Sequence, residues 1–213
     1  MPTFKLIVLD CDGVILESVT AKTRAFNRLF EKYGGEAQRK ITDYHLEHGG
    51  VSRFVKFAWF YHEVLGLDIT EDEQEALGHQ FARLCSDEVM NAPLVPGAME
   101  FILLYYNKIP LYVVSGMPHE ELNEIIRARG LDRFFQGCYG SPPEKTRILA
   151  EIVSSTGVSP SEVLMVGDSA TDLEAAQSVG TLFFGRGHQF SSSKWPWGED
   201  LNSLVEYLRY GII

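Results

Sequence analysis

The sequence has few cysteines and few basic residues, and it lacks any long hydrophobic run. Its 213 residues include only three scattered cysteines, which excludes a full disulfide framework and a cysteine-rich zinc site. A reducing, cytoplasmic location is therefore expected. The first apolar run ends at Asp10 and is too short for a signal peptide or a transmembrane helix, as are the later runs, so no membrane partner is expected.

Basic residues are outnumbered by acidic ones. Nineteen Lys and Arg against 29 Asp and Glu give a formal net charge of −10. Sequence-independent nucleic-acid binding needs a basic face for the phosphates, so no nucleic-acid partner is expected. A small anionic substrate held by a few local cations is still compatible with this charge. The length and the 45% hydrophobic content suit one large domain, or one domain with an insert.

Short aliphatic runs alternate with helical patterns along most of the chain. The predicted strands are 6–9, 111–114, 163–166 and 181–184, with a weaker one at 137–139. Their continuous apolar character is typical of a parallel sheet that is covered on both faces. The predicted helices of this part are 118–129, 143–155, 170–179 and 201–210. This alternation predicts an α/β fold with a doubly wound parallel sheet.

The stretch between the first two strands contains no convincing strand. Helices are predicted here at 21–32, 51–65 and 71–90. A crossover needs about a dozen residues or more, so this much longer stretch predicts a separate all-α domain, residues 17–92. It is inserted into a core domain of residues 1–16 and 93–213. The insert would lie over the carboxyl end of the first strand, where open α/β sheets bind ligands.

Two carboxylates follow the first strand. Asp10 and Asp12 point the same way, because a strand sends alternate side chains to opposite faces. Neighbouring carboxylates repel each other and resist dehydration, so a hard cation between them is the simplest explanation. The alternative is an Asp-Gly turn that ends the strand. By the same alternation Cys11 points away and is expected to be a buried thiol.

Two further strand ends carry polar residues. Asp168 and Asp172 follow the strand 163–166, and neighbouring first and fourth strands would place Asp168 opposite the first carboxylates. Three carboxylates around one point suit Mg²⁺. Asp172 also fits a helix-capping box with Ser169. Ser115 and Gly116 follow the second strand.

Ser115 and the amides of Gly116 and Met117 precede a helix that is expected to begin near Pro118, an arrangement that binds phosphate. Lys145 lies in the first turn of a helix, where the helix dipole disfavours a cation. It makes more sense there beside an acidic cluster and a phosphate. The alternatives are a turn hydroxyl at Ser115 and a solvated lysine at Lys145.

Taken together, these motifs resemble those of a known enzyme family. They are Asp10-Cys11-Asp12-Gly13-Val14, Ser115-Gly116, Lys145 and Gly167-Asp168-Ser169-x-x-Asp172. In type and order they resemble the four motifs of the haloacid dehalogenase superfamily, on its phosphatase side. The insert resembles the family's first cap class, found in phosphoglycolate phosphatase-like and β-phosphoglucomutase-like members. The resemblance implies a Mg²⁺-dependent phosphatase that hydrolyses a small phosphorylated metabolite through an aspartyl-phosphate.

The resemblance also implies a role for each residue of the first motif. Asp10 would be the nucleophile, and Asp12 the general acid for the leaving alcohol and then the base for water. Mg²⁺ would be bound by Asp10, the backbone carbonyl of Asp12, and Asp168. Dehalogenases of the superfamily lack the second aspartate, so Asp12 favours phosphoryl transfer.

The remaining motifs would bind the phosphoryl group. Ser115, Gly116 and Lys145 would hold its oxygens, while Asp172 would act through a water or through Lys145. In the cap, Gly49 to Arg53 resembles a substrate-recognition loop, and Arg53 could pair with an anionic group of the substrate. The alternative for Arg53 is a solvated helix residue.

Two other functions are compatible with these motifs. One is a phosphomutase of the β-phosphoglucomutase type, which returns the phosphoryl group to a sugar. The other is a catalytically weak binding or scaffold protein on the same fold, although binding alone does not need both Asp10 and Asp12. The sequence leaves the oligomeric state open, and a monomer is compatible with it.

Overall fold

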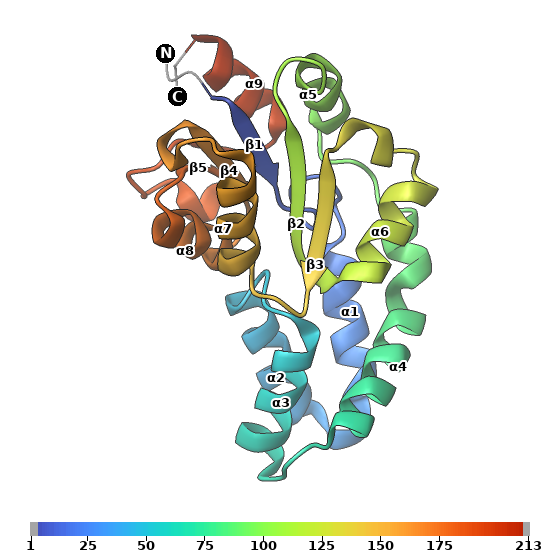
Figure 1. The fold of residues 1–213 in the computed structure, drawn as a ribbon. Coiled ribbons are helices and arrows are strands. Elements are labelled where there is room, and N and C mark those ends of the chain that lie inside the picture. The colour runs from blue at the N-terminus through green and yellow to red at the C-terminus, as the bar shows by residue number, and fades with distance from the viewer. Residues whose placement is uncertain (1–3, 211–213) are drawn as a thin grey trace.

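The core of the protein is a six-stranded parallel sheet, as described for residues 4–210 in a computed structural model (Figure 1). Its strands are β1 (Leu6–Leu9), β2 (Leu111–Pro118), β3 (Gly137–Ser141), β4 (Val163–Gly167), β5 (Leu182–Arg186) and β6 (Trp197–Gly198). Their order is β3-β2-β1-β4-β5-β6, and all neighbours are parallel. The predicted doubly wound sheet is confirmed, and β1 lies between β2 and β4.

Helices cover both faces of the sheet (Figure 1). One face packs against α7 (Lys145–Thr156) and α8 (Ala170–Val179). The other packs against α5 (Ala98–Tyr105), α6 (His119–Ala128) and α9 (Leu201–Tyr210). Strand β1 is buried from both sides, because Leu6 and Val8 belong to the first layer and Ile7 and Leu9 to the second. Each such side chain stabilises the fold by about 1.5–3 kcal/mol relative to exposure.

The cap helices lie beyond the carboxyl ends of the strands, at the lower end of Figure 1. They are α1 (Val19–Leu29), α2 (Gly35–Glu47), α3 (Arg53–Trp59), a π-helical turn (Phe60–Leu65) and α4 (Glu71–Met90). Their common core is aromatic and buried: Phe26, Phe30, Phe57, Phe60 and Phe81. A Thr70–Glu73 capping box starts α4. The division of the chain at residues 17 and 92 stays a prediction.

Four elements differ from the sequence prediction. Helix α5 was not predicted, because its residues are apolar on nearly all sides and show no helical stripe. Helix α2 was not predicted, because only Ala37, Ile41 and His45 of its residues are buried and its apolar stripe is short. Strand β2 continues to Pro118, where it pairs with Ser141 of β3, so α6 begins only at His119. The two-residue strand β6 was also missed. Short 3₁₀ turns occupy Glu31–Tyr33, Asp132–Phe134, Pro160–Glu162 and His188–Phe190.

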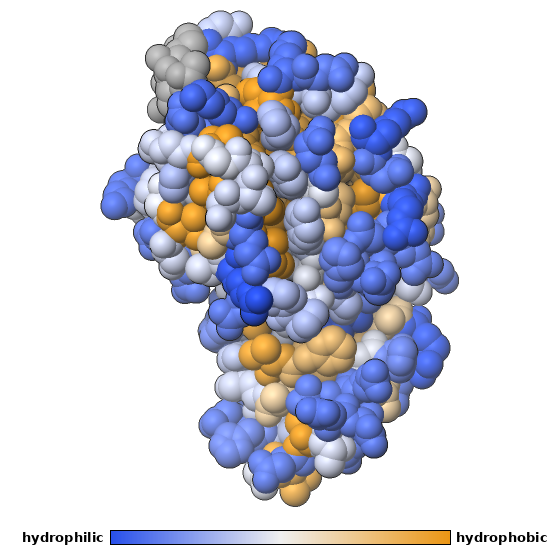
Figure 2. Space-filling model, viewed as in Figure 1, coloured by the Kyte–Doolittle hydropathy of each residue, from blue (hydrophilic) through white to orange (hydrophobic). Residues whose placement is uncertain are grey.

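On the face that Figure 2 shows, hydrophobic residues are visible among hydrophilic ones on both the core and the cap. Large exposed apolar side chains of the cap are Leu46, Val55 and Leu67. Within residues 4–210, every helix is too short or too polar to cross a membrane.

Candidate active site

The ends of β1 and β4 bring together two of the predicted site residues. Asp10 follows β1, and its backbone N–H donates to the Val166 carbonyl of β4 at 2.9 Å. Asp168 follows β4. Carboxylate oxygens of Asp10, Asp168 and Asp172 all lie within 4.8 Å of one another. The predicted approach of Asp168 to Asp10 is therefore present, and it follows directly from the pairing of β1 with β4. The third carboxylate of the cluster is Asp172 and not the predicted Asp12.

Gly13 allows this close approach. Its φ is +75°, which favours glycine, and a Cβ atom built there would lie 1.9 Å from Asp168 Oδ2. Any side chain at this position would push Asp168 out of the cluster. The glycine of the first motif is thus a requirement of the acidic site itself.

Lys145 provides the positive charge of the cluster. It is the first residue of α7, and its Nζ lies 2.8 Å from Asp10 Oδ2 and 2.7 Å from Asp172 Oδ1. The other oxygen of Asp172 accepts from the Ser169 N–H at 3.1 Å and from the Ser169 hydroxyl at 2.5 Å. Asp172 therefore both caps α8 and holds Lys145, so the two interpretations drawn from the sequence coexist. Lys145 is buried, which rules out the solvated alternative.

Two carboxyl groups of the cluster, those of Asp10 and Asp168, have raised pKa values. Burial raises the pKa of Asp10 well above its ordinary value; Lys145 opposes the shift, and the charges of Asp172 and Asp168 add to it. Burial, followed by the charge of Asp172, raises the pKa of Asp168 to about 7. A cation would relieve both effects. The donors are all carboxylate oxygens, which fit a hard divalent ion such as Mg²⁺.

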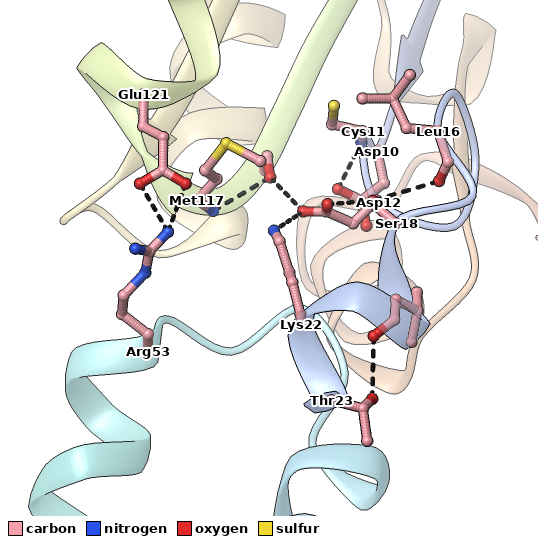
Figure 3. A network of polar contacts seen from close by, with 12 residues as sticks. Asp10, Cys11, Asp12, Leu16, Ser18, Lys22, Thr23, Arg53, Met117 and Glu121 are labelled. Carbon is pink, nitrogen blue, oxygen red and sulfur yellow. Dashed lines mark hydrogen bonds and ion pairs between the residues drawn. The ribbon is translucent and has the colours of Figure 1, made fainter. Parts of the chain in front are cut away.

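Asp12 lies in a different environment (Figure 3). Lys22 Nζ lies 2.5 Å from its Oδ2, the Ser18 hydroxyl donates to Oδ1 at 2.5 Å, and the Ser115 hydroxyl donates to Oδ2 over a long 3.5 Å. Burial opposes ionisation, but the charge of Lys22 and the hydrogen bonds from Lys22 and Ser18 lower the pKa of Asp12. The pKa values of Asp10 and Asp12, two residues apart, are thus shifted in opposite directions.

Two partners of Asp12, Ser18 and Lys22, lie at the N-terminal end of α1, and their contacts with Asp12 were not predicted from the sequence. Ser18 does occupy the N-cap position of that helix, but its hydroxyl bonds to Asp12 instead of capping. Lys22 belongs to none of the motifs that the sequence analysis identified. The available signal was its spacing of four residues from Ser18, which places both side chains on one helix face.

The Ser115 region differs from the predicted phosphate cradle. The Met117 N–H donates to Ser115 Oγ at 3.1 Å, so this amide is already used, and it lies within β2 and not at a helix N-terminus. Ser115 itself is buried beside Asp12. A Cβ atom on Gly116 would lie 2.0 Å from the Gly50 carbonyl oxygen. Gly116 therefore lets the cap loop rest on the strand end.

Arg53 reaches the core but meets a protein carboxylate there. Its Nη2 lies 2.7 and 2.8 Å from the two oxygens of Glu121 on α6 (Figure 3). The guanidinium also lies over the Phe81 ring, 4.6 Å from its centroid. Arg53 is buried, so the solvated alternative is wrong. Its charge is matched by Glu121, which sequence reasoning did not identify because nothing local links the two residues.

A single cavity of about 460 Å³ joins the acidic cluster to the cap. Its core end is lined by Asp10, Asp12 and Asp168, and its cap end by residues of α1, α2, α3 and α4. A volume in this range suits a small-molecule site. A ligand at Asp10 would therefore lie in a space that the cap helps to enclose.

Comparison with known proteins decides the family. The profile described as "Hydrolase: haloacid dehalogenase-like hydrolase" matches residues 4–180. The chain belongs to this family. The resemblance drawn from its motifs is confirmed, and the haloacid dehalogenase-like core and cap account for the fold.

Curated relatives of this haloacid dehalogenase-like hydrolase are named as phosphatases. "Phosphoglycolate phosphatase" of Vibrio parahaemolyticus is 27% identical over 199 residues, covering 85% of this chain and 82% of the relative. "Phosphorylated carbohydrates phosphatase" of Thermotoga maritima is 24% identical, covering 88% of each. A solved β-phosphoglucomutase of Clostridium difficile has a TM-score of 0.79 at 19% identity, covering 97% and 96%, which shows the shared fold. The chain is an enzyme of the phosphatase branch, and the scaffold alternative is set aside.

The raised pKa of Asp168 predicts how the metal-free hydrolase responds to pH. The folded state binds this proton more tightly than the unfolded chain, whose reference value is 3.8. Stability is therefore greatest below about pH 4 for this group and is lost as pH rises toward 7, by roughly a few kcal/mol. Thermal unfolding in EDTA measures this slope, and the matched variant Asp168→Asn should reduce it, with the remaining slope due in part to Asp10. Added Mg²⁺ should stabilise the wild type more at pH 7.5 than at pH 5; an equal effect at both would contradict the prediction.

Proposed function

We propose that this enzyme is a Mg²⁺-dependent phosphatase that hydrolyses a small phosphorylated metabolite through an aspartyl-phosphate intermediate. The observation that carries the proposal is that Asp10 and Asp12 lie in different electrostatic environments. Asp10 lies beside Lys145 and the acidic cluster, while Lys22 and Ser18 favour the ionised form of Asp12. One carboxylate is placed to attack and the other to move protons.

The chemistry consists of two displacements at phosphorus. In the first, a carboxylate oxygen of Asp10 forms the new P–O bond and the ester P–O bond breaks. Asp12 enters this step in its protonated form, gives its proton to the leaving oxygen and becomes ionised. In the second, Asp12 takes a proton from water, whose oxygen attacks phosphorus and releases Asp10. The hydrogen bonds from Lys22 and Ser18 stabilise the ionised Asp12 that this second step needs.

The other site residues would bind and orient the phosphoryl group. Lys145 and the Ser115 hydroxyl would contact its oxygens, with Gly116 allowing close approach at the end of β2. Asp172 would act through Lys145, because its other oxygen is occupied by Ser169. These residues hold the group in line for attack and offset its developing charge.

Asp10, Asp168 and the backbone carbonyl of Asp12 would hold Mg²⁺. When bound, the ion withdraws charge from the phosphoryl oxygens. Its fit rests on the all-oxygen donor set and on the raised pKa values of Asp10 and Asp168, which a divalent cation would reverse.

The substrate is proposed to be a small molecule in a cytoplasmic setting. The cavity volume and the phosphatase names of the relatives support a small phosphorylated metabolite. The three cysteines are free thiols, which supports a reducing compartment. Absence of a nucleic-acid partner remains a proposal based on the net charge of −10, and a monomer is compatible with all of these features.

Release of inorganic phosphate tests the proposal. With Mg²⁺ the purified protein should hydrolyse p-nitrophenyl phosphate and members of a phosphometabolite panel, and excess EDTA should stop turnover until Mg²⁺ is restored. Glucose 1-phosphate in the panel separates the phosphomutase alternative, since a mutase yields glucose 6-phosphate and a phosphatase yields free phosphate. Turnover that survives EDTA unchanged would reject the metal dependence.

A further inference from the structure

A buried lysine–histidine pair lies at the cap end of the cavity. Lys56 of α3 is 2% exposed and His45 of α2 is 7% exposed, yet both line the same cavity as Asp10. Lys56 Nζ lies 2.9 Å from His45 Nδ1 and 3.3 Å from the His45 carbonyl oxygen. The imidazole packs on Phe26, with ring centroids 4.5 Å apart. The family motifs do not include this pair, and the chemistry at Asp10 does not use it.

Lys56 is the cap cation of this cavity whose charge is not matched. Lys22 pairs with Asp12, and Arg53 pairs with Glu121. Among residues 4–210, no carboxylate lies within ion-pair distance of Lys56, whose polar contacts are both with His45. Burial, reinforced by the charge of Lys22, lowers the pKa of Lys56 to about 7. Burial without an acidic partner disfavours the ammonium, so an anion entering the cavity would stabilise it.

The hydrogen-bonding capacity of the pair is also incomplete. A protonated Lys56 can only donate, so His45 Nδ1 accepts and the ring proton lies on Nε2. His45 Nε2 is buried and has no hydrogen-bond partner within the described part of the chain. One N–H of Lys56 and the Nε2–H therefore lack acceptors. An anionic oxygen in the cavity would satisfy the free N–H of Lys56.

We propose that Lys56 and His45 form a binding subsite for a carboxylate on the leaving group of the substrate. The inference rests on the proposed function, because it places the phosphoryl group at Asp10 and the carboxylate at the other end of one cavity. A single unmatched positive charge suits a monoanionic carboxylate, whereas a second phosphate would bring a further negative charge. The substrate class is thus a short phosphorylated hydroxy acid. Arg53 is not the anion site, because Glu121 already holds it.

A matched pair of esters tests the subsite. 2-Phosphoglycolate and 2-hydroxyethyl phosphate have similar size but differ in the carboxylate. Wild-type kcat/KM should favour phosphoglycolate by roughly 10- to 100-fold. Lys56→Met, which removes the charge and keeps most of the length of the side chain, should bring this ratio close to one. Lys32→Met, at an exposed lysine of the same cap, should leave it unchanged.

The ratio is independent of the amount of folded protein, because both esters are turned over by the same molecules. A wild type without preference, or a preference that Lys56→Met retains, would overturn the subsite while leaving the phosphatase in place. If neither ester nor any other phosphomonoester is hydrolysed, the proposed function fails. Calorimetric binding of phosphoglycolate to wild type and Lys56→Met then decides the subsite, with roughly tenfold or greater weakening in the variant as the supporting result.

Discussion

Replacing Asp10 with asparagine is expected to reduce phosphate release by roughly 10⁴- to 10⁶-fold. An amide cannot form the acyl-phosphate that the first displacement requires, and none of the neighbouring carboxylates is placed to substitute. Asp12 is held by Lys22 and Ser18, while Asp172 is engaged by Lys145 and Ser169. The measurement is the kcat for p-nitrophenyl phosphate with saturating Mg²⁺.

The fold should survive this substitution, so the loss can be assigned to chemistry. Asparagine can still accept the Cys11 N–H, which donates to Asp10 Oδ1 at 2.7 Å, and Lys145 keeps its contact with Asp172. A buried carboxyl with a raised pKa is also removed. The Tm without metal should therefore change by only a few degrees. Asp87→Asn, on the exposed side of α4, is the matched control and should keep full activity. Asp10→Asn activity within tenfold of the wild type would refute Asp10 as the nucleophile.

The parts of the fold that were predictable are those fixed by local burial. Leu6–Leu9 reads as a strand because all four residues are buried between two helical layers, and the structure ends the strand where the apolar run ends. Strand β2 was predicted too short, because Ser115 and Gly116 interrupt the apolar run although the chain stays extended to Pro118. Ser115 and Gly116 do not fit the apolar pattern of a buried strand, and their presence is explained by the site at its end.

The acidic cluster was predictable for a topological reason. Neighbouring parallel strands end at the same edge of a sheet, so Asp10 after β1 and Asp168 after β4 must meet once those strands pair. The positions of the motif residues after predicted strands were thus enough to predict that they lie close together. In contrast, contacts between cap and core depend on how segments that are distant in the sequence pack together. Residues Arg53 and Glu121 are 68 positions apart, and no periodicity in the sequence links them.

The same limit applies to the cations of the cap. Arg53 was the candidate anion site because its loop resembled a recognition loop, and nothing in the sequence singled out Lys56. In the structure Glu121 neutralises Arg53, and Lys56 is buried. The sequence does not reveal which lysine and arginine side chains form ion pairs, because that depends on how the folded chain packs.

Replacing Lys145 with methionine should destabilise the metal-free enzyme by about 3–5 kcal/mol. Lys145 lies between Asp10 and Asp172, which are both buried, and these charges raise the pKa of Lys145 although burial opposes them. Without the lysine, the buried carboxylates face one another uncompensated. In a chain of this size the loss corresponds to a Tm decrease of roughly 6–20 °C. Thermal unfolding at pH 7 in EDTA measures it.

Two comparisons separate this electrostatic effect from lost packing. Mg²⁺ should restore part of the stability of Lys145→Met, because the cation supplies charge to the same carboxylates. Adding Asp172→Asn to Lys145→Met should also recover stability, since the two residues interact directly and their effects cannot be additive. Lys108→Met, at an exposed lysine, is the control and should not respond. Equal unfolding temperatures for wild type and Lys145→Met in EDTA would show that the ion pairs do not support the site. Activity of the variant should fall roughly 10²- to 10³-fold even with Mg²⁺, because the phosphoryl oxygens lose their fixed cation.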